Sequence, residues 1–404
     1  MDIEIDKTKI DVTDRSDYGL EMLHYIRCND TDDDKLKNTR GVITNGKKVI
    51  SAMFGYTPEY TVSQRNNISQ YIGDIKNCLF FDSHEGCLIR CCHYEKEWLV
   101  TTHRRLNAFN SRWGSKLTFG DIFLRAVAME YFCNPQFKQH LLEIAGKIEI
   151  DILKSLSSSS PENDLAVFEI FMDTLDKTKQ HLFFIRNNLD NYIVCNPPEH
   201  ETVYYVGSFK TSPSVDFSLE NIGIPLPVKH NINSIDDLIN TVNKSDCFKV
   251  QGIVAYVKNG DGYKLCKIVN DRYISFTKVR NNEPSIRHRY LALRSDPKNS
   301  NLIDGLCYLY PHYVAKFDHI EYMMSIIANT IYKNYVDRYV KHLHTNVPKD
   351  EYKIMKECYD WSMEDIRRRV SRRIVTSILN KQNTQFINMI VKRYALANKQ
   401  KYIA

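Results

Sequence analysis

The chain contains 404 residues, of which 43% are hydrophobic and 26% are charged. This balance is typical of folded globular proteins and excludes a disordered or fibrous chain. The length is sufficient for two or three domains, each with a core of its own. The net charge is +6, from 55 Lys and Arg residues against 49 Asp and Glu residues. Because this excess is small, only a local cluster of basic residues can indicate a polyanionic partner.

Targeting and metal-binding signals are weak. Residues 1–17 contain no basic segment followed by an apolar stretch, and no run approaches the roughly 18 apolar residues of a membrane helix, so we expect no membrane partner. The eleven cysteines are scattered. In "CLIRCCHY" a strand would send Cys91 and Cys92 to opposite faces, which favours buried reduced thiols over zinc. We predict no metal-ligating residues and a cytoplasmic location. The richness in Asn, Ile, Lys and Tyr is typical of an AT-rich genome such as that of a large DNA virus, which would place the protein in the host cytoplasm or the virion.

Short apolar runs separated by turn signals dominate residues 30–261 and predict a mainly antiparallel sheet. Asn45-Gly46 and residues 259–262 each join two β-rich runs, which indicates hairpins. The predicted strands lie within residues 41–54, 87–94, 97–106, 166–172, 181–188, 192–198, 203–209 and 252–268.

Helical patterns interrupt this sheet and then replace it. We predict helices around residues 119–132 and 234–245, the second with Ser234 followed three residues later by Asp237 in the manner of an N-terminal cap. Residues 155–164, "SLSSSSPEND", are polar and read as a surface loop before the next strand. After Pro311 apolar residues recur with a period of 3.6. The fold class is therefore α+β, with an antiparallel-sheet domain over residues 1–300 and an all-α basic domain over residues 301–404.

Six segments follow one another in an order that is more informative than any of them alone. They are "NTRGVIT", "SHEGCLIR", "EWLVTTHRRLNAFNSRW", "AVFEIFM", "FKVQGIVAYV" and "YKLCKIVNDRYISF". In this order they resemble the motifs of the covalent nucleotidyltransferases, the superfamily of nucleic-acid ligases and capping enzymes. The resemblance is greatest to the ATP-dependent RNA ligases of the phage tRNA-repair type, and it implies a ligase-like nucleotidyltransferase domain.

The first three segments correspond to the family's nucleotide-binding motifs. The resemblance places Arg40 at the nucleotide phosphates and Glu85-Gly86 in the turn that carries the nucleophile. Ser83 occupies the position of the family's nucleophilic lysine, whose amine attacks the α-phosphate of ATP. His103 and Arg104 stand nearest to the basic residue of the next motif. From the residues alone, Arg40 also fits a turn arginine, and residues 103–105 fit the solvated start of a helix.

The last three segments correspond to the catalytic strands. The resemblance gives Glu169 a contact with the ribose or the metal and lets Phe171 stack on the base. Gln251 stands where the family has a glutamate, and it brings no negative charge to Mg²⁺. Lys267 takes one of two lysine positions that bind the α-phosphate. Val269 takes the other position, unless Lys264 substitutes for it through a shifted register.

Two arginine-rich stretches are candidates for nucleic-acid binding. Residues 285–294, "SIRHRYLALR", combine Arg287, Arg289 and Arg294 with Tyr290, which suits contacts to phosphates and bases. Residues 363–373, "MEDIRRRVSRR", would form a basic helix surface with a plausible phosphate-binding patch. Its arginines are Arg367, Arg368, Arg369, Arg372 and Arg373.

These patterns leave three functions open. An active protein would use ATP and Mg²⁺ to adenylylate itself and to join RNA 5'-phosphate and 3'-hydroxyl ends, with His84 or a lysine such as Lys76 replacing the missing nucleophile. A degenerate ligase fold would bind RNA or other nucleic acid, or act as a scaffolding subunit with protein partners. A structural or packaging protein would use only its basic helices.

Overall fold

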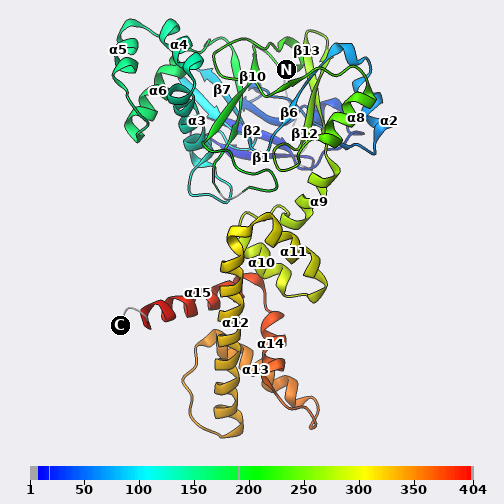
Figure 1. The fold of residues 1–404 in the computed structure, drawn as a ribbon, viewed down its shortest axis with the longest axis vertical. Helices are drawn as coiled ribbons and strands as arrows, with labels where there is room; N and C mark the ends of the chain where they lie inside the picture. The colour runs from blue at the N-terminus through cyan, green and yellow to red at the C-terminus, as the bar shows by residue number, and fades with distance from the viewer. Residues whose placement is uncertain (1–7, 18, 190–191, 402–404) are drawn as a thin grey trace. The chain divides into compact units, whose positions relative to one another are not determined.

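The computed structural model describes residues 8–17, 19–189 and 192–401, except for the side chains of residues 398–401. Residues 1–7, on which the prediction about targeting signals partly rests, lie outside this part. The chain forms two compact units, Met1–Ser275 and Phe276–Ala404. The division at residue 275 precedes the predicted boundary at residue 300, because the end of α9 (Asp271–Arg280) and the whole of α10 (Ile286–Arg294) belong to the second unit (Figure 1).

Three sheets build the N-terminal unit, and every strand pair that is described is antiparallel except β13 with β5. This confirms the predicted antiparallel α+β class. Sheet I has the order β1 (Ile10–Arg15), β2 (Leu20–Tyr25), β3 (Arg40–Asn45), β4 (Lys48–Ser51). Sheet II has the order β10 (Thr202–Phe209), β9 (Gln180–Arg186), β7 (Cys87–Tyr94), β8 (Glu97–Thr101). Sheet III has the order β11 (Lys229–His230), β6 (Cys78–Ser83), β12 (Gly252–Asn259), β13 (Gly262–Val269), β5 (Glu59–Thr61).

Sheets II and III share one hydrophobic cluster, to which Leu182 and Phe209 contribute from one sheet and Phe81 and Tyr256 from the other. Helices cover the remaining face of each sheet. Those packed with sheet II are α3 (Phe119–Cys133), α4 (Pro135–Ile144), α5 (Lys147–Ser155) and α6 (Pro161–Thr174). Those packed with sheet III are α2 (Arg65–Ile72) and α8 (Ile235–Lys244). The two helix groups lie at opposite ends of this unit in Figure 1. The face that helices leave uncovered on each of these two sheets is therefore the one directed at the other sheet.

The predictions based on turn chemistry and capping are confirmed. Asn45-Gly46 joins β3 to β4, and residues 259–262 join β12 to β13, with positive φ at Gly46 and Gly260. The predicted helices are α3 and α8, and the Ser234 hydroxyl accepts a hydrogen bond from the Asp237 amide. Cys91 and Cys92 do lie in different hydrophobic clusters, on opposite faces of β7.

Three predicted elements are wrong. Residues 166–172 belong to helix α6, which begins at Pro161 with Ser160 as its N-cap. Consequently the polar loop that starts at Ser155 leads into a helix and not into a strand. Residues 192–198 form no strand, although their amides are used elsewhere in the unit. Short apolar runs do not distinguish a buried strand from a buried helix segment, and this ambiguity explains the first error.

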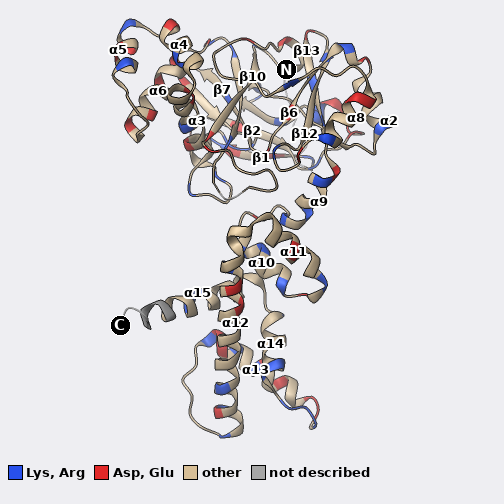
Figure 2. Ribbon diagram, in the orientation of Figure 1, with Lys and Arg blue, Asp and Glu red and all other residues tan. Residues whose placement is uncertain are grey.

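The C-terminal unit is helical, as predicted. Its helices are α10 (Ile286–Arg294), α11 (Ser300–Leu309), α12 (Val314–Tyr335), α13 (Lys349–Met363), α14 (Arg372–Asn380) and α15 (Thr384–Lys401), while α9 (Asp271–Arg280) begins in the N-terminal unit. The predicted apolar face of α12 is buried from Ile320 to Tyr335. Residues 364–371, however, connect α13 to α14 without forming a helix, so the arginine-rich stretch is not the continuous helix surface that the sequence suggested. Figure 2 shows Lys and Arg distributed over elements of both units.

Gly252 tests the packing of sheet III. A Cβ atom at this residue would lie 2.1 Å from the carbonyl oxygen of Ile268 on β13, whereas a Cβ atom on Gly260 would meet nothing within 4 Å. Gly252 also has a positive φ, so Gly252→Ala should cost about 1–3 kcal/mol from overpacking in addition to the strain of that backbone conformation. Gly260→Ala is the matched control from the same hairpin and should cost about 1–2 kcal/mol for its positive φ alone. Denaturant unfolding followed by hydrogen exchange of β12 measures the difference. Equal losses would contradict the close approach of β12 and β13.

Candidate functional site

The register of sheet III brings the predicted catalytic strands together. Gly252 pairs with Ser83 on β6 and with Val269 on β13, and Val254 pairs with Lys267. Directly paired residues point to the same face of a sheet. Ser83, Lys267 and Val269 therefore share the face that is directed at sheet II.

A chain of hydrogen bonds connects these side chains. The Ser83 hydroxyl donates to Gln251 Oε1 at 3.1 Å, and Lys267 Nζ donates to the same oxygen at 3.4 Å. Lys267 Nζ also donates to Glu59 Oε1 at 3.0 Å, and Gln251 Nε2 donates to the Tyr273 hydroxyl at 2.9 Å. Ser83 and Lys267 occupy the two positions that the resemblance places at the α-phosphate. Both side chains donate to the same amide oxygen.

Glu85 anchors the turn between β6 and β7. Its carboxylate accepts hydrogen bonds from the amides of Ile193 at 3.0 Å and Val194 at 2.7 Å, which explains why the segment after residue 191 forms no strand. Burial raises the pKa of Glu85 above its usual value, and hydrogen bonds from backbone amides and from Tyr273 act in the opposite direction. Glu85 is therefore held in place by the protein and serves to position the turn.

A small pocket of about 160 Å³ lies against this turn. Its lining includes Gly86, Trp113, Phe119, Arg186 and Asn187. The volume is below the roughly 300–1,000 Å³ of a complete small-molecule site.

His84 packs face to face on Tyr204, with ring centroids 4.8 Å apart and planes 5° from parallel. Burial lowers the pKa of His84 from 6.5 to about 4, and the charge of Arg186 lowers it further. The imidazole is therefore neutral at pH 7 and engaged in stacking.

Arg40, predicted at the nucleotide phosphates, lies near sheet I together with His103 and Arg104, the predicted basic residues of the next motif. Arg40 on β3 donates to the carbonyl of Gly55 and to the Thr57 hydroxyl, both at 3.4 Å. Burial lowers the pKa of His103 to about 3, with the charges of Arg40 and Arg104 adding to the effect. This group is electropositive with neutral imidazoles, which suits an anion.

Other predicted residues lie elsewhere. Glu169 is exposed on α6, on the helix-covered side of sheet II, and Phe171 is 1% exposed in the core formed with that sheet, against the rings of Phe137 and Phe183. These placements follow from the helical conformation of residues 161–174, and they correct the expected positions of both residues. Lys264 projects from the opposite face of β13 to Lys267, with its ammonium 4.3 Å from the centre of the Tyr71 ring. It cannot replace a second lysine beside Ser83.

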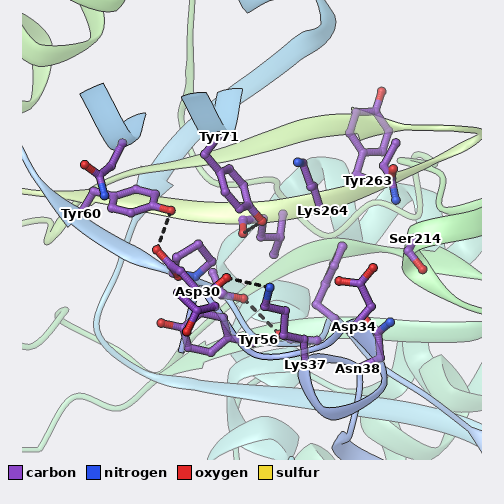
Figure 3. Close-up of a pocket in the computed structure, with 18 of the residues that line it drawn as sticks. Asp30, Asp34, Lys37, Asn38, Tyr56, Tyr60, Tyr71, Ser214, Tyr263 and Lys264 are labelled. Carbon is purple, nitrogen blue, oxygen red and sulfur yellow. Dashed lines mark hydrogen bonds between the residues drawn. The ribbon is translucent and has the colours of Figure 1, made fainter. Parts of the chain in front are cut away.

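A larger cavity of about 660 Å³ is lined by residues from both faces of β13, among them Tyr263, Lys264 and Leu265, and neither Ser83 nor Lys267 lines it. Figure 3 shows the Tyr60 hydroxyl and the Lys37 ammonium directed at Asp30, to which both donate hydrogen bonds. Tyr71 and Tyr263 add two further aromatic rings to its wall. Because none of the side chains in the hydrogen-bond chain around Gln251 lines this cavity, we place the candidate site at the β6–β7 turn instead.

The arginines of α10 support the structure of the C-terminal unit. Arg289 donates to the carbonyls of Val279 and Lys278 at the end of α9. Arg294, with its side chain 9% exposed, pairs with Glu321 on α12. Arg287 is half-buried, and burial lowers its pKa. Binding of nucleic acid by these three residues stays a prediction, and two of the three guanidinium groups already have partners within the protein.

The later arginines are more accessible. Arg367, Arg369, Arg372 and Arg373 are exposed, whereas Arg368 pairs with Glu364 and lies over the Trp361 ring. A cavity of about 510 Å³ is lined by basic and hydroxyl-bearing side chains of α14 together with two residues after α10: Ser295, Pro297, Arg372, Arg373, Thr376, Ser377, Asn380 and Lys381. Two guanidinium groups, an ammonium and several hydroxyls are donors suited to phosphate.

The sequence did not reveal Glu59, Tyr273, Arg186 or His24. Glu59 reaches Lys267 through the parallel pairing of β5 with β13, and Tyr273 reaches Gln251 from the first turns of α9. His24 lies beside His103, with ring centroids 5.4 Å apart. These contacts join residues far apart in the chain, so no local pattern could have indicated them.

Neither a metal cluster nor a membrane helix is found in the described residues. No group of three or more His, Cys, Asp or Glu side chains within residues 8–17, 19–189 and 192–401 converges to hold a metal ion. None of the helices in the same part of the chain is long and apolar enough to cross a membrane.

Comparison with known proteins adds viral relatives. No protein-family model matches the chain. It is 26% identical over 314 residues to the immediate-early protein ICP-46 homolog of Invertebrate iridescent virus 3, a match that covers 76% of this chain and 61% of that protein. It is 22% identical over 377 residues to the corresponding homolog of Invertebrate iridescent virus 6, covering 87% of this chain and 76% of that protein. The chain thus spans about three fifths of the length of the first relative.

Two solved structures are similar at low TM-scores. A chain assigned as an ATP-dependent DNA ligase from Aquifex aeolicus has a TM-score of 0.35 at 11% identity, covering 76% of this chain and 69% of that chain. An archaeal ATP-dependent RNA ligase has a TM-score of 0.36 at 10% identity, covering 73% of this chain and 67% of that chain. At these TM-scores the likeness carries no argument, and the functional argument rests on the residues.

The stacked His84 gives a pH-dependent prediction. Because its pKa is lowered to about 4 in the folded protein, its stabilising contribution is complete above pH 6.5 and is lost as the pH falls from 6.5 towards 4. NMR titration of the imidazole should show no protonation down to pH 5. Arg186→Gln should raise the pKa of His84, since it removes a neighbouring positive charge, while Arg15→Gln on β1 is the control. A normal titration near pH 6.5 in the unaltered protein would contradict the buried stack.

Proposed function

We propose that the N-terminal unit is a ligase-type nucleotidyltransferase domain that binds ATP and acts in the joining of RNA 5'-phosphate and 3'-hydroxyl ends. The observation that supports this most is that Ser83 on β6 and Lys267 on β13, which share the inner face of sheet III, both donate to Gln251 Oε1 just before β12. In the family that the sequence resembles, the lysines at the positions of Ser83 and Lys267 act at the α-phosphate. The motif order alone did not require these three segments to converge.

The surroundings of this group suit a nucleotide. The pocket beside Gly86 fits a base between Trp113 and neighbouring apolar side chains, and Arg186 supplies a cation at its edge. Arg40, His103 and Arg104 supply further donors for phosphates. Mg²⁺ commonly uses one or two carboxylates together with substrate phosphates, so we expect it to bind mainly through ATP. Bound there, it would supply charge neutralisation on the phosphates.

The alternative is a catalytically degenerate ligase fold that binds nucleic acid or serves as a scaffold. Two residues favour it: Ser83 at the nucleophile position, where the side chain is 4% exposed, and the uncharged Gln251. Under either reading the C-terminal unit would hold RNA through the exposed basic residues of α14. Its setting would be the host cytoplasm or a virion.

Binding of ATP is the first test. With Mg²⁺ present, calorimetry should detect ATP binding, and Trp113→Ala should weaken it. Loss of base stacking costs about 1–3 kcal/mol, equivalent to roughly a 5- to 150-fold increase in Kd. Trp361→Phe in the C-terminal unit is the control and should leave the Kd unchanged. If neither ATP nor GTP binds, the nucleotidyltransferase proposal is wrong. Joining of a nicked RNA duplex separates the active enzyme from its degenerate alternative.

Binding of RNA is the second test. The double substitution Arg372→Ser and Arg373→Ser should lower RNA affinity and reduce the slope of log K against log salt by about 1.4, because each lost phosphate contact on a single strand removes about 0.7. Arg15→Ser, which removes an exposed arginine from the N-terminal unit, is the control. Filter binding at several salt concentrations measures the slope, and an unchanged slope would remove α14 from the RNA site.

A further inference from the structure

The nucleophile position of the β6–β7 turn carries no amine, yet an amine lies beside it. Lys267 Nζ and the Ser83 hydroxyl donate to the same oxygen, Gln251 Oε1, at 3.4 and 3.1 Å. Both side chains project from the same face of sheet III, separated by the single strand β12. The ammonium of Lys267 therefore shares a hydrogen-bond acceptor with Ser83, which occupies the position where the resemblance expects a lysine.

Accessibility distinguishes the two groups. Ser83 is 4% exposed, and its hydroxyl donates its hydrogen bond to Gln251. The Lys267 side chain keeps 30% of its exposure, and its partner Glu59 keeps 55%. A ligand phosphate can therefore reach the amine of Lys267 more readily than the hydroxyl of Ser83.

The other candidates for the nucleophile are placed unfavourably. His84 is stacked on Tyr204. Lys76 is exposed in the short helix before β6, and the whole strand, roughly 20 Å, separates it from Ser83. Lys264 lies on the opposite face of β13. Of the three lysines Lys76, Lys264 and Lys267, only Lys267 shares a hydrogen-bond acceptor with Ser83.

We propose that Lys267 is the residue that accepts the adenylyl group, an inference that rests on the nucleotidyltransferase function proposed above. The nitrogen lone pair of Lys267 attacks the α-phosphorus of ATP, a P–N bond forms, and the bond from the α-phosphorus to the bridging oxygen breaks. Pyrophosphate leaves with that electron pair. Before the attack, the Lys267 ammonium gives one proton to the Glu59 carboxylate, whose oxygen lies 3.0 Å from Nζ, and this frees the nitrogen lone pair. The second proton, lost as the P–N bond forms, passes to water. The product is an AMP phosphoramidate on β13 instead of on the turn.

The test uses the full chain with α-labelled ATP and Mg²⁺, followed by denaturation and peptide mapping. The expected adduct lies on Lys267 and is labile in acid, as a phosphoramidate is, whereas an ester on Ser83 would resist acid. Lys267→Arg keeps the charge but removes the nucleophile, so it should abolish the adduct while ATP still binds. In Ser83→Ala, any adduct should still map to Lys267. Lys258→Arg, on the exposed end of β12, is the matched control and should behave as the unaltered protein.

The outcomes separate this inference from the function on which it rests. ATP binding without an adduct, an adduct that persists in Lys267→Arg, or an adduct mapped to another residue would overturn the role of Lys267 and leave nucleotide binding intact. Absence of binding by both ATP and GTP would overturn the proposed function and this inference together. Loss of the adduct in Lys267→Arg with unchanged Kd for ATP would support both.

Discussion

The pairing of β12 with β6 on one side and β13 on the other is the constraint on which the candidate site depends. Gly252 allows this pairing, because its backbone approaches β13 so closely that no side chain fits. The register then fixes which residues of the two outer strands share the inner face. A slip by one residue would exchange the faces and bring Asp82 and Ile268 inward in place of Ser83 and Lys267. The backbone pairing thus determines which side chains can contribute to the site.

The sequence predicted those elements whose signals are local. Asn45-Gly46 and residues 259–262 specify their hairpins through turn chemistry, and Ser234 with Asp237 specifies the start of α8. The run "AVFEIFM" misled because seven apolar-rich residues fit a strand and a buried helix equally well, although Ser160 and Pro161 just before it are helix-start signals. Glu59 and Tyr273 could not be predicted, since they reach the site through pairings and packing across more than 20 residues of chain. The same reason applies to Arg294, whose role depends on Glu321.

The amide of Gln251 matches the hydrogen-bonding groups on both sides of it. Its oxygen accepts from Ser83 and Lys267, and its nitrogen donates to the Tyr273 hydroxyl. That hydroxyl in turn donates to Glu85, and the carboxylate beside it, together with burial, raises the pKa of Tyr273. A glutamate at residue 251 would need a donor from Tyr273, but the single phenolic proton already serves Glu85. The Gln251 amide therefore offers an acceptor to Ser83 and Lys267 and a donor to Tyr273, whereas a carboxylate would place an oxygen without a donor beside the Tyr273 oxygen. The uncharged residue at 251 thus follows from the hydrogen bond between Tyr273 and Glu85.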